Sequence, residues 1–129
     1  QRYLECYFLG AWDIELEPIR DWLDEQDRKT TVQILAALRR LREEGPHLGR
    51  PLVDTVTGSR YPNMKELRPG SSRRSAIRIL FIFDPHRRAI LLIGGDKRTL
   101  WNRWYDKAIP LAEQRYKEYL HTHYDGQQT

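Results

Sequence analysis

Two short segments carry the side chains whose types and spacing could do chemistry on a phosphate group. Residues 63–68 contain Glu66 and Arg68, and residues 76–83 contain Arg78. Both segments have the composition of strands, in which side chains two positions apart point to the same face. If the segments pair antiparallel, Arg68 and Arg78 converge on one open face of the sheet beside Glu66. A carboxylate between two guanidinium groups is either a structural ion pair or an acid–base group among phosphate-binding cations.

A second group of candidate residues follows the last predicted strand. Lys97 and Arg98 place two cations at its end, and Trp101, Trp104 and Tyr105 come shortly afterwards. Aromatic rings between basic side chains can stack on the bases of single-stranded RNA. The same rings could instead pack the last helix on the sheet, whereas the Tyr105 hydroxyl could bind a phosphate while its ring packs.

Further cations are expected to attract the RNA backbone without reading its sequence. The candidates are Arg60, Lys65, Arg73 and Arg74. Lys65 takes the strand face opposite to that of Arg68. The doublet Arg87-Arg88, in a predicted tight turn, is expected to be solvated.

The distribution of charge along the chain favours a phosphate-binding surface. The 129 residues carry a formal net charge of +4, but residues 60–107 hold 12 basic side chains against 4 acidic ones. Residues 1–44 carry a net charge of −3. Seventeen of the 22 basic residues are arginine, whose planar fork of donors matches phosphate oxygens, although a GC-rich genome also raises the arginine content.

Several classes of protein are excluded by composition. One cysteine, Cys6, excludes a disulfide framework and a cysteine-based zinc site. The four histidines have no partners at metal-ligand spacing, no glycine-rich phosphate loop is present, and no serine has an evident base. The apolar runs are too short to span a bilayer, and residues 1–10 make a poor signal peptide. We therefore expect a cytoplasmic protein with no membrane, metal or cofactor, whose chemistry would depend on Arg, Lys, Glu and Tyr.

The first half of the chain predicts a strand and two helices. Residues 12–17 alternate apolar and acidic side chains, as in a half-buried strand, and Pro18 opens a helix over residues 19–26. Asp27 or Thr30 can cap the second helix, which ends at Gly45-Pro46. Its predicted apolar stripe consists of Ile34, Leu35, Leu38 and Leu41.

The second half predicts turns over residues 47–62, then three strands and a helix. The strands are expected over residues 63–68, 76–83 and 89–93, with Gly94-Gly95 breaking or bulging the last one. Helical periodicity returns from Leu100 onward. The predicted fold is α+β, with an N-terminal strand and a helical hairpin packed on a small, mostly antiparallel sheet and a C-terminal helix. Residues 11–125 would form one domain, with an N-terminal arm or extension over 1–10 and a disordered tail over 126–129.

An ordered set of short motifs resembles the RelE/ParE toxin superfamily, in particular its HigB-like, phage Gp49-like branch. The motifs are Trp12-Asp13-Ile14, Leu48-Gly49-Arg50-Pro51-Leu52, Met64-Lys65-Glu66-Leu67-Arg68, Ile77-Arg78-Ile79-Leu80-Phe81, Gly95-Asp96-Lys97, and Ile109-Pro110 followed by Ala112. They extend over residues 11–122 in the family's order. The resemblance implies a RelE-like fold.

The resemblance also implies the toxin of a type II toxin–antitoxin pair, acting as a ribosome-dependent mRNA endonuclease without a metal. In this reaction a ribose 2′-OH attacks the neighbouring phosphate and leaves a 2′,3′-cyclic phosphate end. Cations for the phosphate, a base and an acid are needed, and Arg, Lys, Glu and Tyr can supply all three. The implied partners are an antitoxin with a helix-turn-helix domain, the ribosome with its mRNA, and operator DNA reached through the antitoxin.

By motif, Arg68 and Arg78 occupy the positions of the family's phosphate-contacting arginines. Lys97 or Arg98 matches the basic residue after the last strand, and Tyr105 falls near a tyrosine that some members keep. A histidine found in some members is missing.

The general base is therefore left open among Glu66, Lys97 and Tyr105. Glu66 itself replaces a lysine of RelE, although HigB-like sequences often have glutamate. The superfamily also contains ParE proteins that poison DNA gyrase without nuclease activity. A gyrase inhibitor and an inactive binding module acting as an antitoxin-bound co-repressor are thus the two alternatives.

Overall fold

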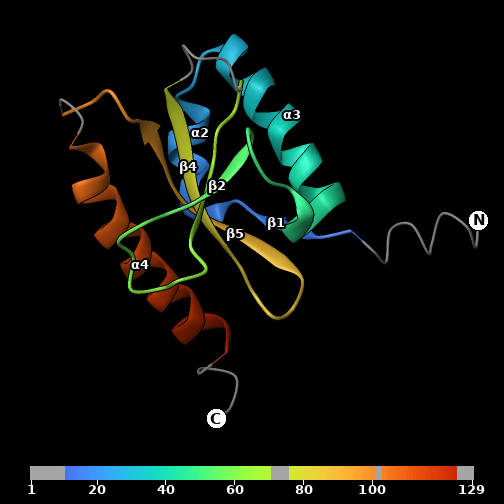
Figure 1. The fold of residues 1–129 in the computed structure, drawn as a ribbon, viewed down its shortest axis with the longest axis vertical. Helices are drawn as coiled ribbons and strands as arrows, with labels where there is room; N and C mark the ends of the chain where they lie inside the picture. Colours follow the sequence, from blue (N-terminus) through green and yellow to red (C-terminus); the bar gives the residue numbers. More distant parts are fainter. Residues whose placement is uncertain (1–10, 71–75, 101–102, 125–129) are drawn as a thin grey trace, which may run out of the picture.

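A five-stranded sheet lies between two helical layers in the computed structural model, which describes residues 11–70, 76–100 and 103–124 (Figure 1). The strands are β1 (Asp13–Glu15), β2 (Val53–Thr55), β3 (Lys65–Leu67), β4 (Ile77–Phe83) and β5 (Arg88–Asp96). The helices are η1 (Glu17–Ile19), α2 (Arg20–Asp24), α3 (Arg28–Glu44), η2 (Gly45–His47) and α4 (Trp104–His123). In the order β1-β5-β4-β3-β2, only the β1–β5 pair is parallel. The α+β prediction is confirmed.

The long helix α3 begins and ends at the predicted residues. Asp27 caps it by accepting a hydrogen bond of 2.7 Å from the Thr30 amide, and Gly45, with φ of 56°, ends it. Its buried stripe consists of Ile34, Ala37, Leu38 and Leu41. The placement of Leu35 in this stripe was wrong: the side chain is 53% exposed because it lies one position out of the i, i+3, i+4, i+7 spacing.

Alternate residues of β4 pack into two separate cores, one on each face of the sheet, because side chains along a strand alternate between its faces. Ile79 and Phe81 pack with α3 on one face, and Leu80 and Ile82 pack with α4 on the other. Figure 1 shows α2 and α3 on one side of the sheet and α4 on the opposite side. The face that carries Arg78 is thus the α4 face.

Two features of the sheet differ from the prediction. Residues 47–62, predicted as turns, contain the short strand β2, which pairs only with β3 and is too brief to show an alternating pattern. The strand β5 is not broken at Gly94-Gly95 but continues to Asp96. Its irregularity falls at Leu92 instead, where the antiparallel pairing with β4 gains one residue.

The last helix begins four residues later than predicted. Leu100 has φ of 66°, a left-handed conformation that no right-handed helix can contain, and α4 starts at Trp104. Pro110 lies inside α4 and does not end it. None of the helices in the described ranges is both long and apolar enough to cross a membrane.

Candidate functional site

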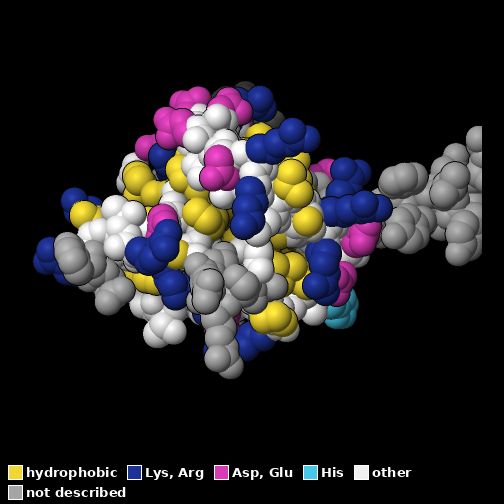
Figure 2. All heavy atoms as spheres, turned by 90° about the horizontal axis from the view of Figure 1, so that it is seen from above, with side chains coloured by type: hydrophobic (Ala, Val, Ile, Leu, Met, Phe, Trp, Pro, Cys, Tyr) yellow, Lys and Arg dark blue, Asp and Glu magenta, His cyan; other side chains and the backbone are white. Residues whose placement is uncertain are grey.

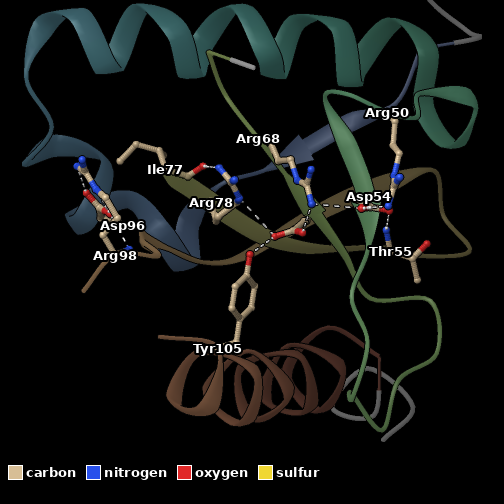
Figure 3. A network of polar contacts seen from close by, with 10 residues as sticks. Arg50, Asp54, Thr55, Arg68, Ile77, Arg78, Asp96, Arg98 and Tyr105 are labelled. Atoms are coloured by element: carbon tan, nitrogen blue, oxygen red, sulfur yellow. Dashed lines mark hydrogen bonds and ion pairs between the residues drawn. The ribbon is translucent and has the colours of Figure 1, made fainter. Parts of the chain in front are cut away.

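Glu66 of β3 is the centre of a cluster of polar contacts on the α4 face. Figure 3 shows Arg68, Arg78 and Tyr105, three of its partners, pointing toward one another. The Tyr105 hydroxyl donates a hydrogen bond of 2.5 Å to Glu66 Oε1, and Arg68 donates one of 3.0 Å to Oε2. Arg78 Nε lies 3.6 Å from Oε1. The predicted convergence of both arginines on Glu66 is therefore confirmed.

This face is not open, contrary to the sequence-based expectation. Glu66 and Arg78 are each only 6% exposed. The reason is that α4 buries its own apolar side chains on β4 and β5 and so covers the face that was expected to be free. Arg68 is the exception, since a third of its side chain (33%) is exposed, and it is the arginine of this group most open to an incoming anion.

A second ion pair extends the cluster along the sheet, and the sequence reasoning missed it. Asp54 of β2 lies directly across from Glu66, and Arg68 bridges the two carboxylates, with 3.2 Å to Asp54 Oδ2. Arg50 donates a 2.9 Å hydrogen bond to the same Asp54 oxygen. This bond, together with the Thr55 amide, holds the pKa of Asp54 below its usual value. The only signal in the sequence was that Arg50 belongs to the motif Leu48-Gly49-Arg50-Pro51-Leu52, with Asp54 two residues beyond its end.

We call Arg50, Asp54, Glu66, Arg68, Arg78 and Tyr105 the site cluster. Three guanidinium groups face two carboxylates in it, so its formal charge is +1. An excess of positive charge at a place that solvent reaches through Arg50 and Arg68 can attract a phosphate.

The Tyr105 hydroxyl keeps its proton far above neutral pH. Burial, followed by the hydrogen bond to Glu66 and the charge of that carboxylate, raises the pKa of Tyr105 to about 12, and the nearby Arg78 acts in the opposite direction. A phenol in this state is a proton donor at neutral pH.

The two cations predicted at the end of the last strand differ in whether they form an ion pair. Arg98 is closed on Asp96, with hydrogen bonds of 2.7 and 3.1 Å, and this contact lowers the pKa of Asp96. The Lys97 amide donates to the Ala76 carbonyl, while its ammonium group has no ion-pair partner among the residues that the structure describes. Lys97 is thus the better candidate for a phosphate contact at this end.

The aromatic residues support packing more than stacking on RNA. Trp104 is 7% exposed and its ring lies against Gly95, so it offers no open face to a base. Trp101, Arg73 and Arg74 lie outside the described residues.

The remaining predicted cations are spread over different parts of the molecule. The Arg60 side chain is 76% exposed and lies 3.8 Å from Glu113 of α4. Lys65 lies on the α3 face, in register with Phe81. These two residues therefore do not join the site cluster.

The expectation that the doublet is solvated holds for Arg87, which is exposed, but was wrong for Arg88, which is only partly exposed and pairs with a buried carboxylate. Arg87 stacks over the Trp12 ring at 4.9 Å. Arg88 lies 3.2 Å from Asp84, whose side chain is completely buried, and Tyr124, the C-cap residue of α4, donates a 2.5 Å hydrogen bond to the same carboxylate. We call Asp84, Arg88 and Tyr124 the hairpin cluster, because it joins the β4–β5 hairpin to the C-terminal end of α4.

Charged groups are mixed with apolar ones on the face of the molecule drawn in Figure 2. Lys and Arg side chains lie between hydrophobic ones there, and Asp and Glu lie both at the upper margin and beside basic side chains elsewhere. No three His, Cys, Asp or Glu side chains within the described ranges are grouped so that they could hold a metal ion.

The fold and the site cluster together define a small RelE-like domain, in which a buried carboxylate is surrounded by arginine side chains. The family described as "Phage derived protein Gp49-like (DUF891)" matches residues 21–117. The chain belongs to this Gp49-like family, and its sequence is of the HigB-like type within the RelE/ParE superfamily.

Two relatives from Mycobacterium tuberculosis are similar over most of the chain. The protein named "Putative toxin HigB2" is 53% identical over 117 residues, which are 91% of this chain and 58% of that protein. The protein named "Putative toxin HigB3" is 47% identical over 113 residues, which are 88% of this chain and 96% of that protein. The chain thus spans little more than half the length of the first relative and nearly all of the second.

Proposed function

We propose that this chain is the toxin of a type II toxin–antitoxin pair and that it cleaves mRNA on the ribosome. Two of its relatives are named as HigB toxins. The observation that carries the nuclease proposal is the contact of one carboxylate, Glu66, with two arginines and a tyrosine whose pKa is raised to about 12. These side chains include a proton acceptor, cations and a proton donor, which are the groups that phosphodiester transesterification requires.

In the proposed reaction a ribose 2′-oxygen bonds to the adjacent phosphorus, and the bond from phosphorus to the 5′-oxygen breaks. Glu66 accepts the proton of the 2′-OH, and Tyr105 gives its proton to the leaving 5′-oxygen. Arg68 stabilises the charge that develops on the phosphate in the transition state. Each proton is thereby accounted for by a side chain of the site cluster.

Because the two arginines differ in exposure, they take different parts in the proposed reaction. Arg68, a third exposed, meets the phosphate first, and Lys97 extends the positive charge toward the end of β5. Arg78 is nearly buried and lies beneath the exposed part of the site cluster, where it holds the Glu66 carboxylate in place.

The proposed partners follow from the same assignment. They are a cognate antitoxin with a helix-turn-helix domain, which covers the toxin, and the ribosome with its bound mRNA. Operator DNA is bound mainly by the antitoxin. A toxin of this kind acts in the cytoplasm.

The test is induction of the chain in a bacterium, followed by mapping of mRNA 5′ ends, with Tyr105→Phe as a comparison. We expect growth arrest and cuts in phase with codons on translated messages, both lost in the variant. Intact mRNA with broken DNA and an SOS response would instead establish a gyrase poison and overturn the nuclease proposal.

A second candidate function is an antitoxin-bound co-repressor without catalysis. The burial of Glu66 and Arg78 favours it, because an ion pair so enclosed can serve structure alone. This candidate predicts no growth arrest on induction, together with unchanged repression of the operon in Tyr105→Phe.

A further inference from the structure

Two consecutive glycines in β5 admit one tryptophan each, from opposite faces of the sheet. A Cβ atom at Gly94 would lie 2.4 Å from the Trp22 ring, and one at Gly95 would lie 2.4 Å from Trp104 Nε1. Neither glycine has a positive φ, so the backbone conformation does not require glycine at either position. Room for the indole rings is the reason that a side chain is excluded.

The two tryptophan contacts differ in what they adjoin. Gly95 is the pairing partner of Arg78 on β4, so the Trp104 ring enters the sheet on the face of the site cluster. Gly94 pairs with Ile79, and Trp22 packs on the opposite face, in the core shared with α3. The chain therefore offers one contact beside the site and a matched one remote from it.

The Gly95–Trp104 contact fixes the first turn of α4. The helix starts at Trp104, and its N-cap residue, Arg103, makes no capping hydrogen bond through its side chain. Tyr105 comes next, with its ring edge-on to that of Trp104 at 5.0 Å and its hydroxyl 2.5 Å from Glu66. A change in the depth at which the indole enters the sheet would move the neighbouring phenol as well.

We propose that Gly95 and Trp104 are positioning residues for the site: by letting the indole ring enter the sheet, Gly95 sets where the Tyr105 hydroxyl lies over Glu66. As a role in catalysis this rests on the proposed nuclease function. The positioning itself is a property of the folded chain and can be measured without RNA.

The test compares Gly95→Ala with Gly94→Ala, since each adds one methyl group at the same 2.4 Å distance from an indole. On ribosome-bound mRNA, Gly95→Ala is expected to lower kcat by on the order of 10²-fold with little change in KM, as misplacement of a reacting group does. Gly94→Ala should retain the kcat of the unmodified protein. Adding Trp104→Phe to Gly95→Ala makes room for the methyl group and should restore most of the loss.

A second readout does not depend on RNA cleavage. The tyrosines are titrated by ultraviolet absorbance, and subtracting the curve of the matching Tyr105→Phe variant isolates the Tyr105 phenol. The isolated pKa should be about 12 in the unmodified protein. It should stay there in Gly94→Ala and fall in Gly95→Ala. If Gly95→Ala does not fold, Trp104→Leu takes its place, since it removes the ring without adding an atom at the glycine.

Equal effects of Gly94→Ala and Gly95→Ala on kcat, or an unchanged Tyr105 titration in Gly95→Ala, would overturn the proposal. If the unmodified protein cleaves no mRNA, the nuclease function is wrong, while the titration still decides whether Gly95 positions Tyr105.

Discussion

The site cluster and the hairpin cluster are built from the same three kinds of side chain. Glu66 and Asp84 are buried carboxylates, and each accepts a 2.5 Å hydrogen bond from a tyrosine at one end of α4, Tyr105 in its first turn and Tyr124 directly after its last residue. Each also has arginine beside it. The two clusters hold opposite ends of α4 to the sheet.

They differ in how completely the carboxylate is satisfied by the surrounding structure. Asp84 accepts hydrogen bonds from the main-chain amides of His86 and Arg88, and its charge is balanced by one guanidinium, that of Arg88. Arg88 also donates to the Tyr124 hydroxyl. The hairpin cluster is thus neutral, and its carboxylate is fully buried.

The site cluster instead has one positive charge in excess and two arginines, Arg50 and Arg68, that reach solvent. The same chemical groups therefore serve structure where charges balance, and can serve an anionic ligand where they do not. Perturbing matched residues of the two clusters should separate stability from activity.

The largest expected effect is on stability, from Arg88→Ala. Removing this guanidinium leaves the fully buried Asp84 without its ion-pair partner, which should lower the free energy of unfolding by about 3–5 kcal/mol. Urea denaturation measures the change. The cleavage rate per folded molecule should stay unchanged, and a stability loss below about 1 kcal/mol would contradict a structural role for this cluster.

The next effect is on activity, from Arg68→Ala. Loss of a donor to the developing charge should slow cleavage by about 10²–10³-fold, or about 2.7–4 kcal/mol. Stability should change by less than about 1 kcal/mol, because the side chain is partly exposed and Glu66 keeps Arg78. Arg50→Ala is the matched control, since it also removes an arginine from Asp54, but one that is 78% exposed. An equal loss of cleavage in both variants would show that only general charge matters.

Replacing the tyrosine of each cluster by phenylalanine should have opposite effects on activity and on stability. Tyr105→Phe should slow cleavage by about 10²-fold or more, as expected for removal of a general acid. Tyr124→Phe should leave cleavage unchanged and lower the free energy of unfolding by about 1.5–3 kcal/mol, because a hydrogen bond to a charged group is lost. Both rates and both denaturation curves are needed, and full cleavage activity in Tyr105→Phe would remove this residue from the mechanism.

A smaller effect is expected on stability at alkaline pH. The pKa values of Tyr105 and Tyr124 are both raised to about 12, through burial first and through their carboxylate partners next. Between the ordinary tyrosine pKa of about 10 and this value, the unfolded chain has lost the proton that the folded chain retains, so stability falls as pH rises. The contribution is fully present below about pH 10. Across this pH window the free energy of unfolding should fall less steeply with pH in either Phe variant than in the unmodified protein. Identical slopes would contradict the raised pKa values.

Strand parity was enough to predict the centre of the site from sequence. Side chains alternate with a fixed period of two, so Glu66, Arg68 and Arg78 could be assigned to one face once the strands were recognised. The same rule explains why alternate residues of β4 lie in two different cores, although the sequence did not show that the face of Arg78 is covered.

What covers that face could not be predicted, since it depends on tertiary packing. The face was expected to be open because nothing local to β3 or β4 indicates where α4 lies. The doublet Gly94-Gly95 suggested a break, but both glycines are explained by indole rings, those of Trp22 and Trp104, that come from other elements of the fold. The hairpin cluster was missed for the same reason, since Arg88 and Tyr124 are 36 residues apart. The pattern along the chain thus predicts which face of a strand a side chain lies on. Its contacts with residues in another layer of the fold can be seen only in the structure.

The smallest expected effect comes from Lys65→Ala, which tests the assignment of faces itself. Lys65 is one position from Glu66 on β3 but lies on the α3 face, in register with Phe81. Its removal should change both the cleavage barrier and the free energy of unfolding by less than about 0.5 kcal/mol, as at an ordinary surface position. Cleavage assays beside Arg68→Ala provide the comparison, since both variants remove one positive charge from neighbouring positions. A loss in Lys65→Ala as large as that in Arg68→Ala would place the RNA on the α3 face, and the excess charge of the site cluster would then have another explanation.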